Sequence, residues 1–234
     1  MFYFDYTYVL FMIPCIIISL ICQVRVKSAF SKYSKIPNTR GMTGAQAAEY
    51  VLRHNNVTGV RIEHVSGELT DHYDPRSNVI RLSDSVYNSA TVAAVGVAAH
   101  EAGHAVQTAQ NFLPNKLRGA ILPAARLGSS LSWILITLGF LFSYGRSSST
   151  GLYILYAGII LFSASVAFTI ITLPVEFDAS RRALRCFRET GVLQGEEYSG
   201  AKSVLSAAAM TYVASAITAI MQLLRLLLIA RRRD

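Results

Sequence analysis

Long apolar runs dominate the chain and predict several membrane-spanning helices. Four runs contain no charged residue over a spanning length, namely residues 6–24, 127–145, 147–175 and 203–224. Each is close to the roughly 20 residues that an α-helix needs to cross the core of a bilayer. Only Arg146 separates the second run from the third, within the sequence GRSSSTG. We therefore expect these two runs to form a tight transmembrane hairpin.

Shorter periodic segments lie between the apolar runs. Residues 42–55 begin with Thr43 as a helix cap and Gln46 three positions later, and continue with strong helix formers, which predicts a helix. Residues 57–82 alternate apolar and polar side chains and contain turn signals at Gly67 and in the sequence DPRSN, which predicts a small antiparallel sheet.

The segment TVAAVGVAAHEAGHAVQTAQ, residues 91–110, predicts a helix that is apolar around nearly its whole circumference. Such helices are normally buried. After the hairpin we expect a short helix over residues 175–188, with Pro174 in its first turn, then a polar loop over 189–200 and a long apolar C-terminal helix. The expected fold class is mainly α and integral to the membrane, with a small β element and about three to four membrane helices.

Composition and charge support a membrane protein. Hydrophobic residues make up 52% of the chain, charged residues 15%, and the mean hydropathy is +0.37, whereas a soluble domain contains about 25% charged residues. The net charge of +8 is best explained by anionic lipid at the membrane surface. No motif for RNA or DNA is present, so nucleic acid is not an expected partner. The cysteines, Cys15, Cys22 and Cys186, form no CxxC pair and predict no disulfide framework.

The distribution of Lys and Arg predicts the orientation. Residues 25–120 hold eleven of them and residues 174–202 hold five, whereas the hairpin loop 145–151 holds one. We therefore expect both basic regions to face the cytosol, with the N-terminus and the hairpin loop outside. The tail RRRD conflicts with this orientation if residues 203–230 cross completely. We therefore expect that helix to be partly packed against protein, with its end along the inner surface.

The sequence His100-Glu101-Ala102-Gly103-His104 is an HExxH motif. Positions i and i+4 share one face of a helix, so both imidazoles can reach one zinc ion. Glu101 lies about 100° around the helix, where it can act as the general base that takes a proton from the attacking water. A surface helix that contains these residues by chance is a poor alternative, because burying them without partners would cost several kcal/mol.

A catalytic zinc site needs three protein ligands and one open position. No third His follows at the HExxHxxGxxH spacing. Apart from Glu176, the candidates for the third ligand are three earlier histidines and three acids of the expected polar loop: His54, His64, His72, Glu189, Glu196 and Glu197. The histidines are expected in ordinary surface or core roles and the acids in solvent. Glu176 is almost the first polar group after the hairpin returns to its starting side, so it is the expected third ligand; alternatively, it only marks the membrane interface.

These features together resemble a family, the YugP-like neutral zinc metallopeptidases of bacterial membranes. The resemblance covers the N-terminal anchor and the sequences YDPRSNVIRLS, VAAHEAGHAVQ, LPVEFDASRRAL and AAAMTYVASAITAIMQLLRLL. The chain is also similar to membrane gluzincins of the prenyl-protease and HtpX kind, which contain HExxH and a downstream ExxxD. The resemblance implies a helical gluzincin-like core with one Zn²⁺ per chain, held by His100, His104 and Glu176, and with Glu101 as the catalytic base.

One position departs from the ExxxD pattern of those relatives. Four residues after Glu176 stands Ser180, and Asp178 stands at plus two. Asp178 is a candidate to replace the carboxylate that orients a ligand histidine in the relatives. Alternatively, it is a helix N-terminal charge that pairs with Arg181 or Arg182.

Two further features are candidates for holding a substrate. Tyr212 can donate a hydrogen bond to the tetrahedral intermediate, or else it belongs to the core of an apolar helix. The segment SNVIRLS can be an edge strand that pairs with the substrate backbone, or an ordinary strand of the sheet.

The sequence therefore predicts a multi-pass protein of the cell membrane that hydrolyses protein or peptide substrates with zinc, its catalytic region facing the cytosol. The expected parts are an anchor (1–24), a metallopeptidase region (25–120), a transmembrane hairpin (121–174), a third-ligand helix and loop (175–202), and an apolar helix with a basic tail (203–234). The main alternative is a membrane scaffold or adaptor with a structural or degenerate zinc site, which would not need Glu101. A transporter or channel is disfavoured, because the apolar runs hold almost no ionisable residues.

Overall fold

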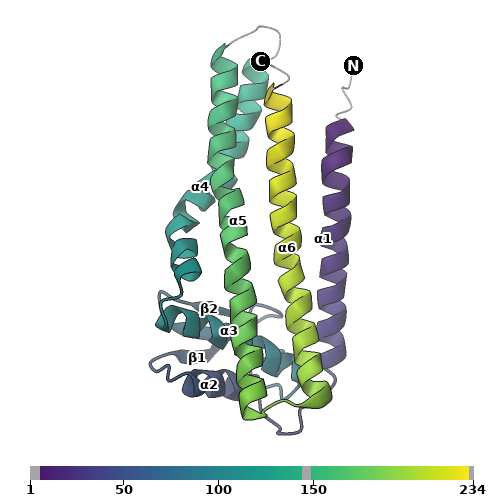
Figure 1. The fold of residues 1–234 in the computed structure, drawn as a ribbon, viewed down its shortest axis with the longest axis vertical. Helices are drawn as coiled ribbons and strands as arrows, with labels where there is room; N and C mark the ends of the chain where they lie inside the picture. The colour runs from purple at the N-terminus through teal and green to yellow at the C-terminus, as the bar shows by residue number, and fades with distance from the viewer. Residues whose placement is uncertain (1–5, 144–148, 232–234) are drawn as a thin grey trace. The chain divides into compact units, whose positions relative to one another are not determined.

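The structure is a computed structural model, and it describes residues 6–143 and 149–231 (Figure 1). The helices are α1 (Tyr6–Tyr33), α2 (Gly44–His54), α3 (Val92–Ala109), α4 (Leu113–Phe142), α5 (Ser149–Thr190) and α6 (Gly195–Arg231). The strands β1 (Arg61–His64), β2 (His72–Asp74) and β3 (Val79–Leu82) form one sheet. The prediction of a mainly α fold with a small β element is confirmed.

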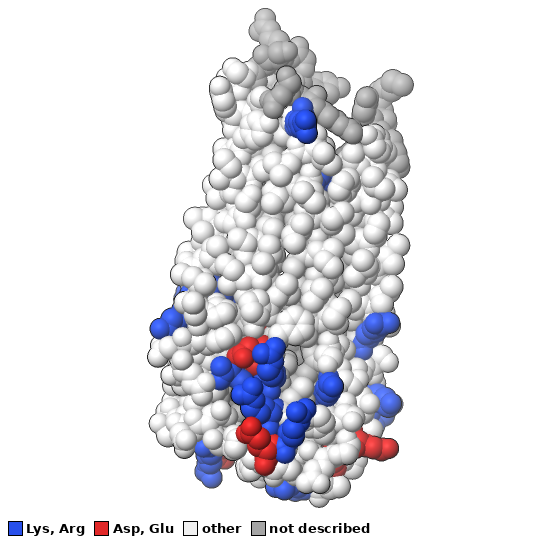
Figure 2. All heavy atoms as spheres, viewed as in Figure 1, with Lys and Arg blue, Asp and Glu red and all other residues white. Residues whose placement is uncertain are grey.

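Four helices are long and apolar enough to cross a membrane by length and composition, namely α1, α4, α5 and α6. This number agrees with the three to four membrane helices expected from the sequence. Figure 2 shows broad areas of the drawn face without charged side chains. The turn expected between α4 and α5 falls largely on residues 144–148, which lie outside the described residues, as does the end of the basic tail.

The chain forms two compact units. The first unit comprises Met1–Ile21, Leu117–Leu173 and Tyr212–Asp234, and the second comprises Cys22–Lys116 and Pro174–Thr211. In the first unit, α4 and α5 run antiparallel in close contact. A Cβ at Gly139 would lie 2.6 Å from the backbone nitrogen of Leu155, and a Cβ at Gly128 would lie 2.5 Å from the carbonyl oxygen of Leu161. The glycines therefore permit a helix packing that larger residues would prevent.

The second unit has a core to which α2, β3, α3, α5 and α6 all contribute. One buried side chain from each element illustrates this core, in the order Val51, Ile80, Val95, Phe187 and Leu205, and none of the five is more than 3% exposed. The helix predicted at the start of this region is confirmed as α2. Its capping box is formed as the sequence suggested, with the side chains of the cap residue and the N3 glutamine each bonded to the other's backbone N–H.

The sheet is mixed rather than antiparallel, and its strand order is β1-β3-β2. The sequence DPRSN joins β2 to β3 as an antiparallel pair, whereas β1 pairs parallel with β3. The expectation of an antiparallel sheet is therefore wrong for one of the two pairings, because the chain crosses from the end of β1 to the far side of β3 before β2 begins. The interpretation of SNVIRLS as an edge strand is also wrong, since β3 is paired on both sides.

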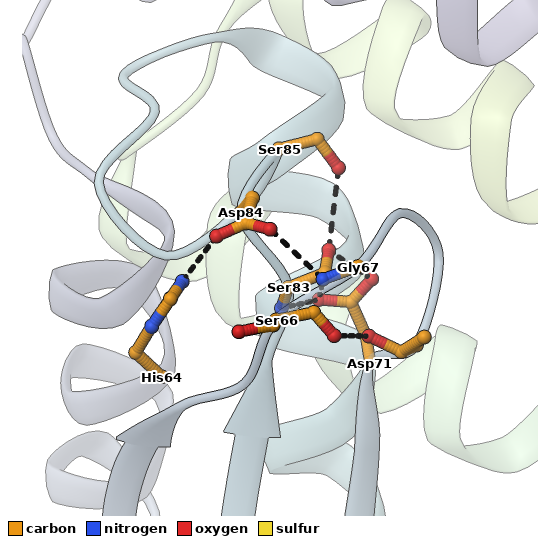
Figure 3. Close-up of polar contacts among 8 residues, drawn as sticks. His64, Ser66, Gly67, Asp71, Ser83, Asp84 and Ser85 are labelled. Atoms are coloured by element: carbon orange, nitrogen blue, oxygen red, sulfur yellow. Dashed lines mark hydrogen bonds and ion pairs between the residues drawn. The ribbon is translucent and has the colours of Figure 1, made fainter.

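Side-chain hydrogen bonds fix the loop between β1 and β2 against the residues after β3 (Figure 3). The Nε2 atom of His64 lies 2.6 Å from Oδ1 of Asp84, and the N–H of Gly67 donates to the other carboxylate oxygen at 2.8 Å. The hydrogen bond from Gly67 and, to a smaller extent, the hydrogen bond with His64 lower the pKa of Asp84. The backbone N–H and the hydroxyl of Ser83 both donate to Asp71. His64 is thus a structural residue of this loop.

The helix expected to begin at Pro174 is instead the last part of α5, which runs unbroken from Ser149 to Thr190. Proline removes one helical hydrogen bond and usually kinks a helix. Here Val175 and Ala179, just beyond it, are fully buried, at 0% exposure. Their packing accounts for the continuation of the helix through this point.

The expectation of a polar loop over residues 189–200 is also wrong, except for the few residues at its centre. α5 ends at Thr190, where Gly191 adopts a left-handed conformation with φ +64°, as is common after a helix C-terminus. α6 begins four residues later, at Gly195, with Glu196 and Glu197 in its first turn. The helix dipole stabilises acidic residues at a helix N-terminus, so the two acids mark a helix start rather than a loop.

Candidate metal centre

The HExxH motif lies within α3, at a point where this helix contacts α5 very closely. A Cβ at Gly103 would lie 2.6 Å from the carbonyl oxygen of Ala179. That separation is too short for any side-chain atom, so glycine is what permits the close approach. As a result, the two motif histidines of α3 face residues at the start of the second-unit part of α5.

Three side chains converge across this helix contact. The Nε2 atom of His100 lies 3.3 Å from Oε2 of Glu176, and Nε2 of His104 lies 3.5 Å from the same oxygen. One ligand atom from each residue lies within 4.8 Å of the others. The carboxyl side chain is 3% exposed and the imidazoles 15% and 13%. Among the described residues, this is the cluster of His, Cys, Asp and Glu whose geometry could hold a metal ion.

The donor set and its spacing fit zinc. Two imidazole nitrogens and one carboxylate oxygen are the donors of many catalytic zinc sites. Two ligand atoms at about 2.0–2.1 Å from a tetrahedral zinc lie roughly 3.3 Å apart. The separations of His100 and His104 from Glu176, 3.3 and 3.5 Å, are close to that value.

Gln107 fixes the orientation of His104. Its amide nitrogen donates to the carbonyl oxygen of Val175 at 2.7 Å and to the carboxylate of Asp178 at 3.0 Å. Both partners are acceptors, so the amide oxygen must face the other way, where it lies 3.1 Å from Nδ1 of His104. That oxygen accepts a hydrogen bond, and Nδ1 therefore bears the proton in the neutral imidazole. The lone pair remains on Nε2, the atom that faces Glu176.

Ser180 contacts the other imidazole, since its hydroxyl lies 3.0 Å from Nδ1 of His100. Asp178 has two partners. It accepts from Gln107 and also from Nε of Arg182, at 2.5 Å. The ion pair with a nearby arginine is therefore present, although Asp178 lies inside α5 rather than at a helix N-terminus. Its role in orienting a ligand histidine stays a prediction, since its contact on that side is with Gln107.

Glu101 is buried beside the cluster, at 9% exposure. Burial alone would lower the pKa of His104, but the carboxylate of Glu176 and then the charge of Glu101 outweigh burial and raise it. Both carboxylates thus favour positive charge at this point of the second unit. A divalent metal ion bound at this point would supply such a positive charge.

Two of the other candidate histidines have partners outside this cluster. His54 contacts Glu189 at 3.1 Å, and Nδ1 of His72 lies 2.8 Å from the carbonyl oxygen of Thr70. Tyr212 belongs to the first unit, and its role as a donor stays a prediction. Sequence reasoning missed Gln107. The available signal was a glutamine three residues after the second motif histidine, in a helix with few other polar side chains.

Comparison with known proteins gives the class of the chain. Residues 8–231 match the family described as "Putative neutral zinc metallopeptidase", and the chain belongs to this family. A relative in Bacillus subtilis (strain 168), "Putative membrane protease YugP", is 43% identical over 212 residues, which cover 91% of each of the two chains. No solved structure matches the chain.

Proposed function

We propose that the chain is a membrane-bound, zinc-dependent metallopeptidase that hydrolyses peptide bonds in protein or peptide substrates. The observation that supports this most directly is the convergence of His100, His104 and Glu176 within the contact between α3 and α5. We propose these three as the ligands of one zinc ion per chain. When bound, zinc would lower the pKa of a water molecule toward about 7 and polarise a peptide carbonyl.

The chain's own groups supply the remaining chemistry. Glu101 takes a proton from the attacking water and returns it to the leaving amine. Gln107 keeps His104 in the tautomer and orientation that direct Nε2 to the ligand cluster, and Ser180 orients the ring of His100. Asp178 holds the Gln107 amide in place and acts through it. Tyr212 is proposed as a donor to the tetrahedral intermediate.

Metal removal tests this function. We expect purified full-length protein in detergent to cleave a mixture of fluorogenic peptides, to lose that activity with a zinc chelator, and to regain it on addition of Zn²⁺, since the metal supplies the activated water. The assay should be followed by fluorescence, with zinc content measured in parallel by elemental analysis. Cleavage that survives removal of all bound metal would contradict the proposal.

We also propose that residues 25–120 face the cytosol and that Ser148, outside the described residues, faces the exterior. The reason is the distribution of Lys and Arg. In intact cells, a membrane-impermeant thiol reagent should label Ser148→Cys and should miss Ser66→Cys until the membrane is permeabilised. The natural cysteines, Cys15, Cys22 and Cys186, are buried, so background labelling should be low. The reverse pattern would overturn the orientation.

A further inference from the structure

The second unit contains a cationic groove of about 480 Å³ between the end of α5 and the beginning of α6. Three arginines of α5 line it, Arg181, Arg185 and Arg188, together with Lys202 of α6. All four are exposed, and no acidic residue lines the groove. Lys and Arg side chains gather over this part of α5 in Figure 2. The floor is largely apolar, with Leu184, Leu205 and Ala209 among its residues.

No acidic side chain in the described part of the chain pairs with the charges of this groove. None of the four cations forms an ion pair with a described residue, whereas the neighbouring Arg182 is paired with Asp178. The acid that follows the last arginine, Glu189, contacts His54. At the far end, Arg188 donates to the hydroxyl of Tyr198 at 2.8 Å. The groove therefore presents uncompensated positive charge above an apolar floor.

The groove adjoins the candidate metal centre. Ser180 lines it, and the hydroxyl of the same serine lies 3.0 Å from Nδ1 of His100. From that end the arginines follow along one face of α5 at positions i, i+4 and i+7. Arg181 and Arg185 are therefore about 6 Å apart along the helix axis, and Arg185 and Arg188 about 4.5 Å. Alternate side chains of an extended peptide lie roughly 6.6 Å apart, so the first two arginines have nearly the spacing of every second side chain in an extended chain.

We propose that this groove binds a segment of the peptide substrate that contains acidic side chains at alternate positions. The proposal rests on the peptidase function proposed above and adds a substrate class to it. A row of cations that extends along the helix matches a row of carboxylates better than it matches one lipid phosphate. The apolar floor accommodates the small side chains between the acids.

Peptide binding tests this without requiring turnover. The probes are two fluorescent decapeptides, one alternating Glu and Ala and the other alternating Gln and Ala, titrated into full-length, zinc-loaded Glu101→Gln protein in detergent. By fluorescence anisotropy at low salt, the Glu peptide should bind about tenfold more tightly, the combined effect of a few partly exposed ion pairs. This preference should vanish near 0.5 M salt, where the Debye length falls to a few Å.

Three further variants, each made in the Glu101→Gln background, separate the groove from net charge. Arg181→Gln with Arg185→Gln should abolish the preference for the Glu peptide. Lys35→Gln with Arg76→Gln removes the same charge from exposed positions outside the groove and should keep it. Arg181→Lys with Arg185→Lys should also retain most of it. Because the arginines are exposed, circular dichroism and thermal melting of every variant should match those of the parent.

Two outcomes would overturn the proposal. One is a preference for the Glu peptide that persists in the Arg181/Arg185 double glutamine variant or is lost equally in the Lys35/Arg76 control. The other is loss of co-purifying phosphatidylserine from the groove variant with peptide preference unchanged, which would make the groove a lipid site. The binding assay uses the Glu101→Gln protein, which lacks the proposed base, whereas the proposed function is tested by zinc-dependent cleavage with the parent protein. A negative result in one of these two experiments is therefore distinguishable from a negative result in the other.

Discussion

Glu101→Gln is expected to lower peptide hydrolysis by at least about 10²-fold, the low end of what general base catalysis contributes. The amide has nearly the same shape as the carboxylate but cannot accept the proton of the attacking water. Glu101 cannot easily be a ligand, because adjacent helical residues point about 100° apart. Zinc content should therefore stay near that of the parent. Single-turnover cleavage of a fluorogenic peptide, with elemental analysis, measures both quantities.

The matched control is Glu49→Gln, an exposed acid on α2 that pairs with Arg53 and lies outside the cluster. It should leave cleavage unchanged. A scaffold with a structural zinc site predicts instead that Glu101→Gln has no functional effect. Cleavage at the parent rate by the Glu101→Gln protein would reject the proposed mechanism, whatever the metal content.

Glu176→Ala is expected to weaken zinc binding by more than about 100-fold, since loss of a partner that merely orients a ligand already costs about 10–100-fold. The change removes the carboxylate that lies 3.3 and 3.5 Å from the two imidazoles. Under mild chelation the variant should retain almost no zinc by elemental analysis, and cleavage should be lost with it.

Glu189→Ala is a close control for this variant. It makes the same substitution on the same helix, and it also removes a carboxylate that contacts a histidine, His54. Zinc retention should match that of the parent, because this pair lies away from the cluster. If Glu176→Ala also kept its zinc, Glu176 could not be a ligand.

Local sequence signals predicted the parts of the fold that local interactions determine. The capping residue of α2, the apolar character of α3 and the four long helices all followed from composition and period. The pairing of β1 with β3 did not, because it depends on where the chain crosses the sheet. The continuity of α5 through Pro174 did not either, because the packing of Val175 and Ala179 against other elements outweighs the preference of proline.

The candidate metal centre likewise has features that the sequence predicted and features that it did not. The i, i+4 spacing placed His100 and His104 on one face, and counting the remaining acids led to Glu176. The bond from Gln107 to Val175 joins residues 68 positions apart, and no periodicity reports such a contact. The position of Asp178 beside that amide likewise depends on how α3 and α5 cross.

The contact between Gly103 and Ala179 has a thermodynamic consequence. Backbone meets backbone there, at the limit of close packing, so the packing of two helices determines the separation of the proposed ligands on α3 and α5. A preorganised set of ligands loses little conformational entropy when it binds. In small zinc domains, by contrast, metal binding and folding are one equilibrium. Here the second unit has its own hydrophobic core, so we expect the affinity of the proposed zinc site and the stability of the fold to change independently in evolution.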